Sequence, residues 1–190
     1  MRARHFTDER GFTLIEMMLV VAIGLIVVGI AIPNVQGMIK SSRADGGLTQ
    51  LATAIRNARE LSVAARRNVQ VTFGTNTIMA TKIDVGGATV LLRTTTLEGR
   101  NKFQPPPANV TTDTPDAFGK ADSSGINLGT KVPAMFTTDG SLINQDGDVI
   151  NGSIFIGIPG DPLSIRAVTI FGPTGAMRLW KWDGTKWIEA

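Results

Sequence analysis

Outside its first eleven residues, the chain offers few side chains that could carry out a reaction. It has no cysteine and no tyrosine, and its one histidine is His5, so the usual nucleophiles, bases and nitrogen or sulfur metal ligands are missing from the rest. Carboxylates are left, but no pair of acids can be placed across a cleft from sequence alone. We therefore expect a protein that is not an enzyme, with no catalytic residue and no cofactor.

Three aspartates stand beside glycines in the second half of the chain, in the stretches Asp139-Gly140 and Asp146-Gly147-Asp148. Carboxylate oxygens suit calcium, but their spacing does not match the twelve-residue loop of an EF-hand. Asp-Gly sequences are also frequent in tight turns. We interpret both stretches as turns, assign no metal site, and leave open whether Asp139, Asp146 and Asp148 bind calcium.

One acid stands out because it lies in an apolar stretch. Glu16 is the single charge between Leu14 and Ile32, a run about as long as a bilayer is thick. A carboxylate is costly in such a run and usually marks a function. The alternative is a side chain that reaches back to the membrane surface, since Glu16 is close to the start of the run. In both cases this segment is predicted to lie in a membrane.

The residues before the apolar run indicate its orientation. Arg2, Arg4 and Arg10 would hold this end in the cytoplasm and leave the rest of the chain outside. Secretion with cleavage near Ala31 is the alternative, but the run is long for a signal and the chain continues as helix after it. We therefore predict a polar leader over residues 1–11 and a transmembrane helix over residues 12–33.

The seven residues from Arg10 to Glu16, RGFTLIE, resemble the prepilin signature of type IV pilins and type II secretion pseudopilins. The resemblance implies that a prepilin peptidase cuts after Gly11 and that Phe12 becomes the N-methylated first residue. It also implies that the Glu16 carboxylate pairs with the α-amine of Phe12 on a neighbouring subunit during filament assembly. At about 4 Å and an effective dielectric constant of roughly 20, such a pair is worth about 4 kcal/mol before desolvation.

An amphipathic continuation of the helix is predicted over residues 34–68. Pro33 lacks the amide hydrogen that a helix interior needs, which predicts a kink there, and Gly46 and Gly47 add weak points. Apolar residues recur at helical spacing at Leu48, Leu51, Ala52, Ile55, Ala58, Leu61 and Ala65. Four arginines stay off this stripe: Arg56, Arg59, Arg66 and Arg67. Those near the end of the helix would complement the negative end of its dipole.

From residue 69 the apolar period changes to two, which predicts strands. Three antiparallel strands are expected over residues 69–73, 77–85 and 88–97, the last two joined by Gly86-Gly87. A second sheet is expected from strands near 132–138, 153–158, 164–171 and 175–182. Residues 99–130 are rich in residues that break helices and strands, which predicts a long exposed loop that is either a contact surface or disordered.

The final two strands form a predicted hairpin around Asp183-Gly184, a strong two-residue turn signal. Counting outward from this turn pairs Trp182 with Thr185, Lys181 with Lys186, Trp180 with Trp187 and Arg178 with Glu189. The three tryptophans then share one side of the hairpin. We expect that side to be buried against the helix or a neighbouring subunit, because opposed lysines are tolerated only toward solvent or an anion. An exposed tryptophan face would instead indicate a binding patch.

The fold class predicted from these elements is α+β, and the resemblance to prepilins implies a pilin-like form of it: a long N-terminal α-helix packs its second half on the antiparallel β-sheets of a domain spanning residues 69–190. Two further stretches are similar to the GspH/FimT family, which comprises the H-type minor pseudopilins of type II secretion and related minor pilins. They are the helix end Ala58–Arg67, which runs into a strand, and the segment Ile170–Gly175 before the final strand.

This resemblance implies a minor pseudopilin that takes part in the assembly or tip of a periplasmic type II secretion pseudopilus and in protein secretion. The protein would be a single-pass protein of the bacterial inner membrane with its C-terminal domain in the periplasm. Its partners would be other pseudopilins or pilins, the prepilin peptidase, inner-membrane lipid and secreted protein substrates.

A minor type IV pilin in pilus biogenesis or DNA uptake is the alternative function. Family members in natural transformation bind DNA through an arginine-rich C-terminal motif that this chain lacks. The net charge of +3 is also too small to indicate nucleic acid, so this partner is disfavoured but left open. A major pilin is less favoured, because many major pilins close a C-terminal loop with a disulfide and this chain has no cysteine.

Overall fold

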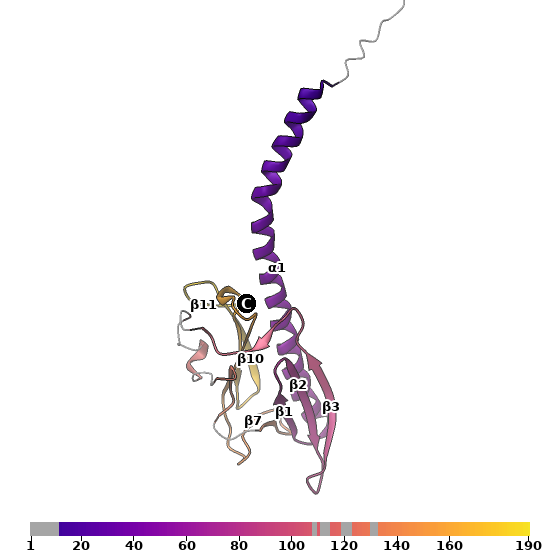
Figure 1. Ribbon diagram of the computed structural model, residues 1–190. Helices are drawn as coiled ribbons and strands as arrows, with labels where there is room; N and C mark the ends of the chain where they lie inside the picture. The colour runs from indigo at the N-terminus through magenta and orange to yellow at the C-terminus, as the bar shows by residue number, and fades with distance from the viewer. Residues whose placement is uncertain (1–11, 108–109, 111–114, 119–122, 130–132) are drawn as a thin grey trace, which may run out of the picture. The chain divides into compact units, whose positions relative to one another are not determined.

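The computed structural model describes residues 12–107, 110, 115–118, 123–129 and 133–190, except for the side chains of residues 31 and 33–36. Gly11 and the rest of the predicted leader lie outside these residues. Two compact units make up the chain, Met1–Ile39 and Lys40–Ala190. The helix α1 (Leu14–Ala65) begins in the first unit and ends in the second, and all strands belong to the second (Figure 1).

The first unit contains the apolar part of α1. Residue 33 is assigned as helix, and the kink at Pro33 stays a prediction. Within the described part of the chain, no helix is both long enough and apolar enough to cross a membrane.

The part of α1 in the second unit is amphipathic, as predicted. Leu48, Leu51, Ile55 and Ala58 on the apolar stripe are buried. The helix ends at Ala65 rather than at residue 68 because the next residue, Arg66, has a left-handed φ of 50°. The last turn of α1 therefore contains no basic residue.

The first sheet has the strand order β3-β2-β1-β6-β7. Its strands are β1 (Val69–Phe73), β2 (Thr77–Ile83), β3 (Thr89–Thr96), β6 (Ala134–Phe136) and β7 (Leu142–Ile143). The three strands predicted after the helix are confirmed, and Gly86 and Gly87 both have positive φ at the turn between β2 and β3. The prediction that residues 132–138 join the second sheet is wrong, because β6 pairs with β1.

The second sheet has the order β11-β10-β9-β8-β4, and β5 also pairs with β8. Its strands are β4 (Lys102–Phe103), β5 (Ile126–Asn127), β8 (Gly152–Gly157), β9 (Arg166–Phe171), β10 (Ala176–Trp182) and β11 (Trp187–Glu189). Two short 3₁₀ turns lie outside the sheets, η1 (Pro115–Ala117) and η2 (Pro162–Ser164). All pairs in both sheets are antiparallel.

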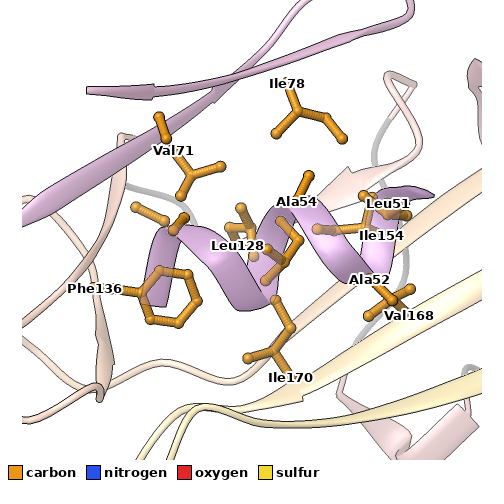
Figure 2. Packing of buried hydrophobic residues seen from close by; sticks show 14 of the residues in the cluster. Leu51, Ala52, Ala54, Val71, Ile78, Leu128, Phe136, Ile154, Val168 and Ile170 are labelled. Atoms are coloured by element: carbon orange, nitrogen blue, oxygen red, sulfur yellow. The ribbon is translucent and has the colours of Figure 1, made fainter. Parts of the chain in front are cut away.

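One hydrophobic core joins α1 to both sheets (Figure 2). Leu51 and Ile55 come from the helix, Val71 and Phe136 from the first sheet, and Ile154 from the second. Removing one such side chain typically costs about 2–5 kcal/mol, because burial is lost and a cavity remains. This packing confirms the predicted α+β class, in which the second half of the helix packs on antiparallel sheets.

The register predicted for the final hairpin is wrong by two residues. The observed pairs are Trp182–Trp187, Lys181–Ile188 and Trp180–Glu189. The Asp183 carboxylate accepts hydrogen bonds from the amides of Thr185 and Lys186 at 2.7 and 2.8 Å, so the turn is centred on Gly184-Thr185 instead of Asp183-Gly184. A shift of two residues preserves the alternation of faces, and the three tryptophans remain on one side, as predicted.

The tryptophan face packs on residues other than those of the helix, which was one of the two predicted covers; the other, a neighbouring subunit, stays a prediction. Trp182 and Trp187 form a second cluster with Val110 and Ile165, and Trp187 also contacts the ring of the fully buried Phe155. Residues on either side of Phe155 in β8 point into the core shared with α1, so Phe155 lies on the opposite face of the sheet.

Segment 99–129 is not an exposed loop over its described residues. It supplies β4, β5 and the buried side chain of Val110 in the tryptophan cluster. Asp116 then fastens it to the sheet, because its carboxylate accepts a hydrogen bond from Thr169 at 2.6 Å and pairs with Arg178 at 2.8 Å. The face of the second sheet opposite α1 is partly apolar, and this segment shields part of it from solvent.

The start of the same segment lies against α1. Asn101 is fully buried and donates from Nδ2 to the carbonyls of Arg43 and Glu98 at 2.8 and 2.7 Å. Its amide group occupies the space beside Gly47, where a Cβ would overlap Asn101 Nδ2 and lie 2.6 Å from Cγ. The two helical glycines therefore differ, since a Cβ at Gly46 would meet nothing within 4 Å.

Alanine at these neighbouring positions should have effects of opposite sign. Gly46→Ala is expected to raise the free energy of unfolding by about 1 kcal/mol, the helix preference of alanine over glycine. Gly47→Ala should lower it by about 2 kcal/mol, because the methyl group displaces the buried Asn101 amide. Urea unfolding followed by tryptophan fluorescence measures both changes. Equal stabilisation by the two substitutions would mean that Asn101 does not hold the segment on the helix.

Candidate functional site

The N-terminal end of α1 is the candidate site, because it contains Phe12 and Glu16. Phe12 is exposed and lies two residues before Leu14, the first residue of the helix. Thr13 precedes the first helical residue, and its hydroxyl accepts a hydrogen bond from the Glu16 amide at 3.3 Å. The Glu16 carboxylate in turn accepts from the Thr13 amide at 3.4 Å. The two residues thus form a capping box, in which each side chain serves the other's backbone.

The capping box gives Glu16 a role within its own chain that our sequence analysis missed. The pattern Thr-x-x-Glu directly before an apolar helix is its sequence signal. The carboxylate is exposed, so it lies where a second chain could also reach it. It also lies in the first turn of α1, where a negative charge is favoured by the helix dipole.

The helix that follows exposes an unusual amount of apolar surface. Its large apolar side chains from Leu14 to Ile32 are more than half exposed wherever they are described. Soluble monomers rarely leave contiguous apolar patches of this extent uncovered, and such patches mark contacts with lipid or protein. One continuous helix contains both this surface and the capped acid near its N-terminal end.

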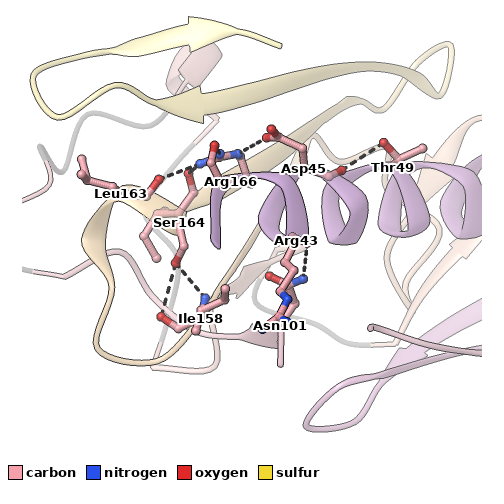
Figure 3. A network of polar contacts seen from close by, with 10 residues as sticks. Arg43, Asp45, Thr49, Asn101, Ile158, Leu163, Ser164 and Arg166 are labelled. Atoms are coloured by element: carbon pink, nitrogen blue, oxygen red, sulfur yellow. Dashed lines mark hydrogen bonds and ion pairs between the residues drawn. The ribbon is translucent and has the colours of Figure 1, made fainter. Parts of the chain in front are cut away.

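A polar network fixes the part of α1 in the second unit (Figure 3). Arg166 of β9 is buried, and its guanidinium donates to Asp45 Oδ1 at 2.7 Å and to the Ser41 hydroxyl at 3.2 Å, both on α1. It also donates to the carbonyls of Leu163 and Ile165 at 2.8 and 3.0 Å. Arg166 therefore connects the helix to the second sheet and to the loop before β9.

The aspartate-glycine stretches are turns, which confirms our interpretation. Gly140 and Gly147 have φ values of 84° and 90°. The Asp139 carboxylate accepts hydrogen bonds from the Thr137 hydroxyl and from the amide and hydroxyl of Ser141, and Asp148 accepts one from Asn144. Among the described residues, no three His, Cys, Asp or Glu side chains are arranged to hold a metal ion.

The Asp139 turn should make the free energy of unfolding depend on pH in the acidic range. The hydrogen bond from Thr137, followed by those from Ser141, lowers the pKa of the Asp139 carboxyl from 3.8 to about 2. A lowered pKa in the folded state adds stability above the unfolded value, and this contribution is lost as pH falls from 3.8 toward about 2. Urea midpoints across that range should therefore decline less in Asp139→Asn than in the parent chain. Parallel curves would show that the turn does not hold the ionised carboxylate.

Comparison with known proteins identifies the N-terminal segment. Residues 7–32 match the family described as the prokaryotic N-terminal methylation motif, and this range includes the RGFTLIE residues on which the predicted prepilin signature rests. No curated protein matches the chain in sequence. Two solved structures of the minor pseudopilin EpsH from the type II secretion system of Vibrio cholerae are similar.

These two EpsH structures are 11% and 12% identical to the chain. The alignments cover 72% and 73% of this chain and 96% and 94% of the EpsH chains, each with a TM-score of 0.47. Likeness at this level is too low to support an argument about the fold or the function of the second unit.

Proposed function

We propose that the chain is a minor pseudopilin, a subunit of a periplasmic type II secretion filament that takes part in its assembly or tip and in protein secretion. The observation that carries this proposal is the methylation motif at residues 7–32, together with a helix that begins at Leu14, exposes apolar side chains and continues into a folded β domain. An exposed apolar surface of this extent indicates contact with lipid or with another protein chain.

The apolar helix is surrounded first by membrane lipid and later by neighbouring subunits. Before assembly it lies in the lipid of the bacterial inner membrane, with the leader on the cytoplasmic side and the second unit in the periplasm. The sequence run from Leu14 to Ile32 supports this anchor. In the filament, the same side chains pack against the helices of neighbouring subunits.

Glu16 acts in this transfer from membrane to filament. After the prepilin peptidase removes residues 1–11, the N-methylated amine of Phe12 is the positive group closest to the apolar run. Glu16 on a neighbouring subunit pairs with that amine, since an acid and an amine in an apolar setting stabilise each other where neither is stable alone. The partners are therefore other pseudopilins, the peptidase and inner-membrane lipid, and the tip contacts secreted proteins.

The mature N-terminus tests the proposal directly. Mass spectrometry of the protein from its own cells should find chains that begin at N-methylated Phe12 and retain the apolar helix. Gly11→Ala keeps the apolar run but should block cleavage, leaving the leader attached. Mature chains that begin near residue 32 would overturn the proposal, because the helix would then be a discarded signal.

A minor type IV pilin that takes up DNA is not favoured by the described residues. Arg178, one of the C-terminal cations, is engaged by Asp116 at 2.8 Å. Phosphate contacts weaken steeply as salt rises, so DNA binding that persists at low salt and falls with added salt would support that function instead. We propose no catalytic residue and no metal site for this chain.

A further inference from the structure

The strands at the ends of the two sheets differ in length. β7 and β4 have two residues each and β11 has three, whereas β3 has eight. Proteins commonly protect sheet edges by keeping them short, since an open edge offers unpaired amides and carbonyls to any other strand. β3 lacks this protection, and Figure 1 shows it at the outside of its sheet.

The composition of β3 is also that of a strand suited to pairing. Its sequence, TVLLRTTT, is rich in β-branched residues and has no proline or lysine. Val90, Leu91 and Leu92 are exposed. A bulge where β2 pairs with β3, between Ala80 and Thr81, is the single irregularity in this register. No described strand pairs with β3 on its open side.

The direction of the β3 amides follows from the hydrogen bond that ends the strand pair. The Leu97 amide donates to the Asn76 carbonyl at 2.8 Å, toward β2. Because successive amides in a strand point to opposite sides, those of Thr96 and Thr94 point away from β2. The amides and carbonyls of Thr94 and Thr96 can therefore form hydrogen bonds with a further strand.

The side chains beside this edge indicate what kind of strand fits. Arg93 is the single charge of β3, and it has no ion pair with any described residue. Together with Thr95 it borders a hollow of about 230 Å³ along α1. The helix lines this hollow with uncharged residues, which are polar except for Ala54: Thr49, Gln50, Thr53, Ala54 and Asn57. A strand added to β3 would place its helix-side residues next to this hollow and beside Arg93.

We propose that β3 is a docking edge that takes an extended segment of another protein as an added β-strand, with a carboxylate facing Arg93. A different protein fits better than a second copy, because β3 contains no acid and a second β3 strand would therefore offer Arg93 no counter-charge in any register. The backbone ladder supplies affinity and the Arg93 contact supplies selectivity. This proposal does not depend on the function proposed above.

A designed peptide tests the edge in the full chain, held in detergent micelles. The probe is an eight-residue peptide of alternating threonine and valine with one central aspartate. It should slow hydrogen–deuterium exchange at the Thr94 and Thr96 amides, measured by NMR. Replacing aspartate by lysine should weaken binding about tenfold, which corresponds to about 1.4 kcal/mol. N-methylation of alternate peptide amides should abolish the protection.

Two variants make the test specific to the edge. Thr94→Pro removes an outward amide without touching the bonds to β2, and it should abolish peptide binding, whereas Thr94→Ala should preserve it. Arg93→Glu should invert the preference, so that the lysine peptide binds more tightly. Equal binding by Thr94→Pro, or an unchanged preference in Arg93→Glu, would overturn the proposal. So would a lack of protection at millimolar peptide, or protection by self-association alone.

Discussion

Asp45→Ala is expected to lower the free energy of unfolding by about 2–3 kcal/mol. It leaves the Arg166 guanidinium buried and without a counter-charge. Breaking a buried ion pair from one side costs about 3–5 kcal/mol. The expected loss lies at or below the low end of that range because the Asp45 side chain is 53% exposed, and solvent weakens its ion pair with Arg166.

Removing the arginine should cost less than removing its partner. Arg166→Met fills the same space with an apolar chain and leaves Asp45 facing solvent, so a loss of about 1 kcal/mol is expected. The double variant should then be more stable than Asp45→Ala alone, since its second substitution removes the unpaired charge. Urea unfolding of the four chains forms a double-mutant cycle. Additive losses would show that the two side chains act independently.

Local patterns were sufficient to predict the helix and most strands. The change of apolar period from 3.6 to 2 at residue 69 marks the boundary between α1 and β1, and the burial of Leu51 and Ile55 follows directly from helical spacing. Elements that depend on distant partners were not predictable in this way. β6 has only three residues, and nothing in Ala134–Phe136 itself shows that its neighbour is β1.

The final hairpin shows a limit of turn signals. Asp183-Gly184 is a strong signal for a turn, but it does not distinguish an aspartate inside the turn from one that caps it from outside. The alternation of tryptophans was correct because a two-residue shift leaves it unchanged. What covers that face was not predictable, since the segment with Val110 carries no periodic pattern.

At the candidate site, the sequence indicated which residue matters but not which residue it bonds to. Glu16 stood out as the one charge in an apolar run, yet its partner in the folded chain, Thr13, is a common residue in a common motif. Arg166 had a weaker signal, a lone charge in an apolar strand. Its partner Asp45 is 121 residues away in sequence, a separation at which no spacing rule connects two side chains.

Glu16→Ala is expected to reduce incorporation of the chain into filaments by at least about tenfold, the factor that 1.4 kcal/mol of lost pairing energy gives. Folding of the second unit and membrane insertion should be unaffected. The substitution alone does not isolate the cause, because Glu16 both caps α1 and is proposed to pair with the Phe12 amine of a neighbour. Two further variants separate these roles.

Glu16→Gln keeps the capping box, since glutamine at this position accepts the same backbone hydrogen bond, but it removes the charge. Thr13→Ala removes the cap, at a cost of about 1 kcal/mol to the helix start, and keeps the charge. If the carboxylate pairs with an amine, Glu16→Gln should assemble as poorly as Glu16→Ala, while Thr13→Ala assembles nearly as well as the parent chain. Filament yield, measured by shearing and quantitative immunoblotting, gives the order of the variants. The reverse order would assign Glu16 to the helix of its own chain, because only the loss of the cap would then matter.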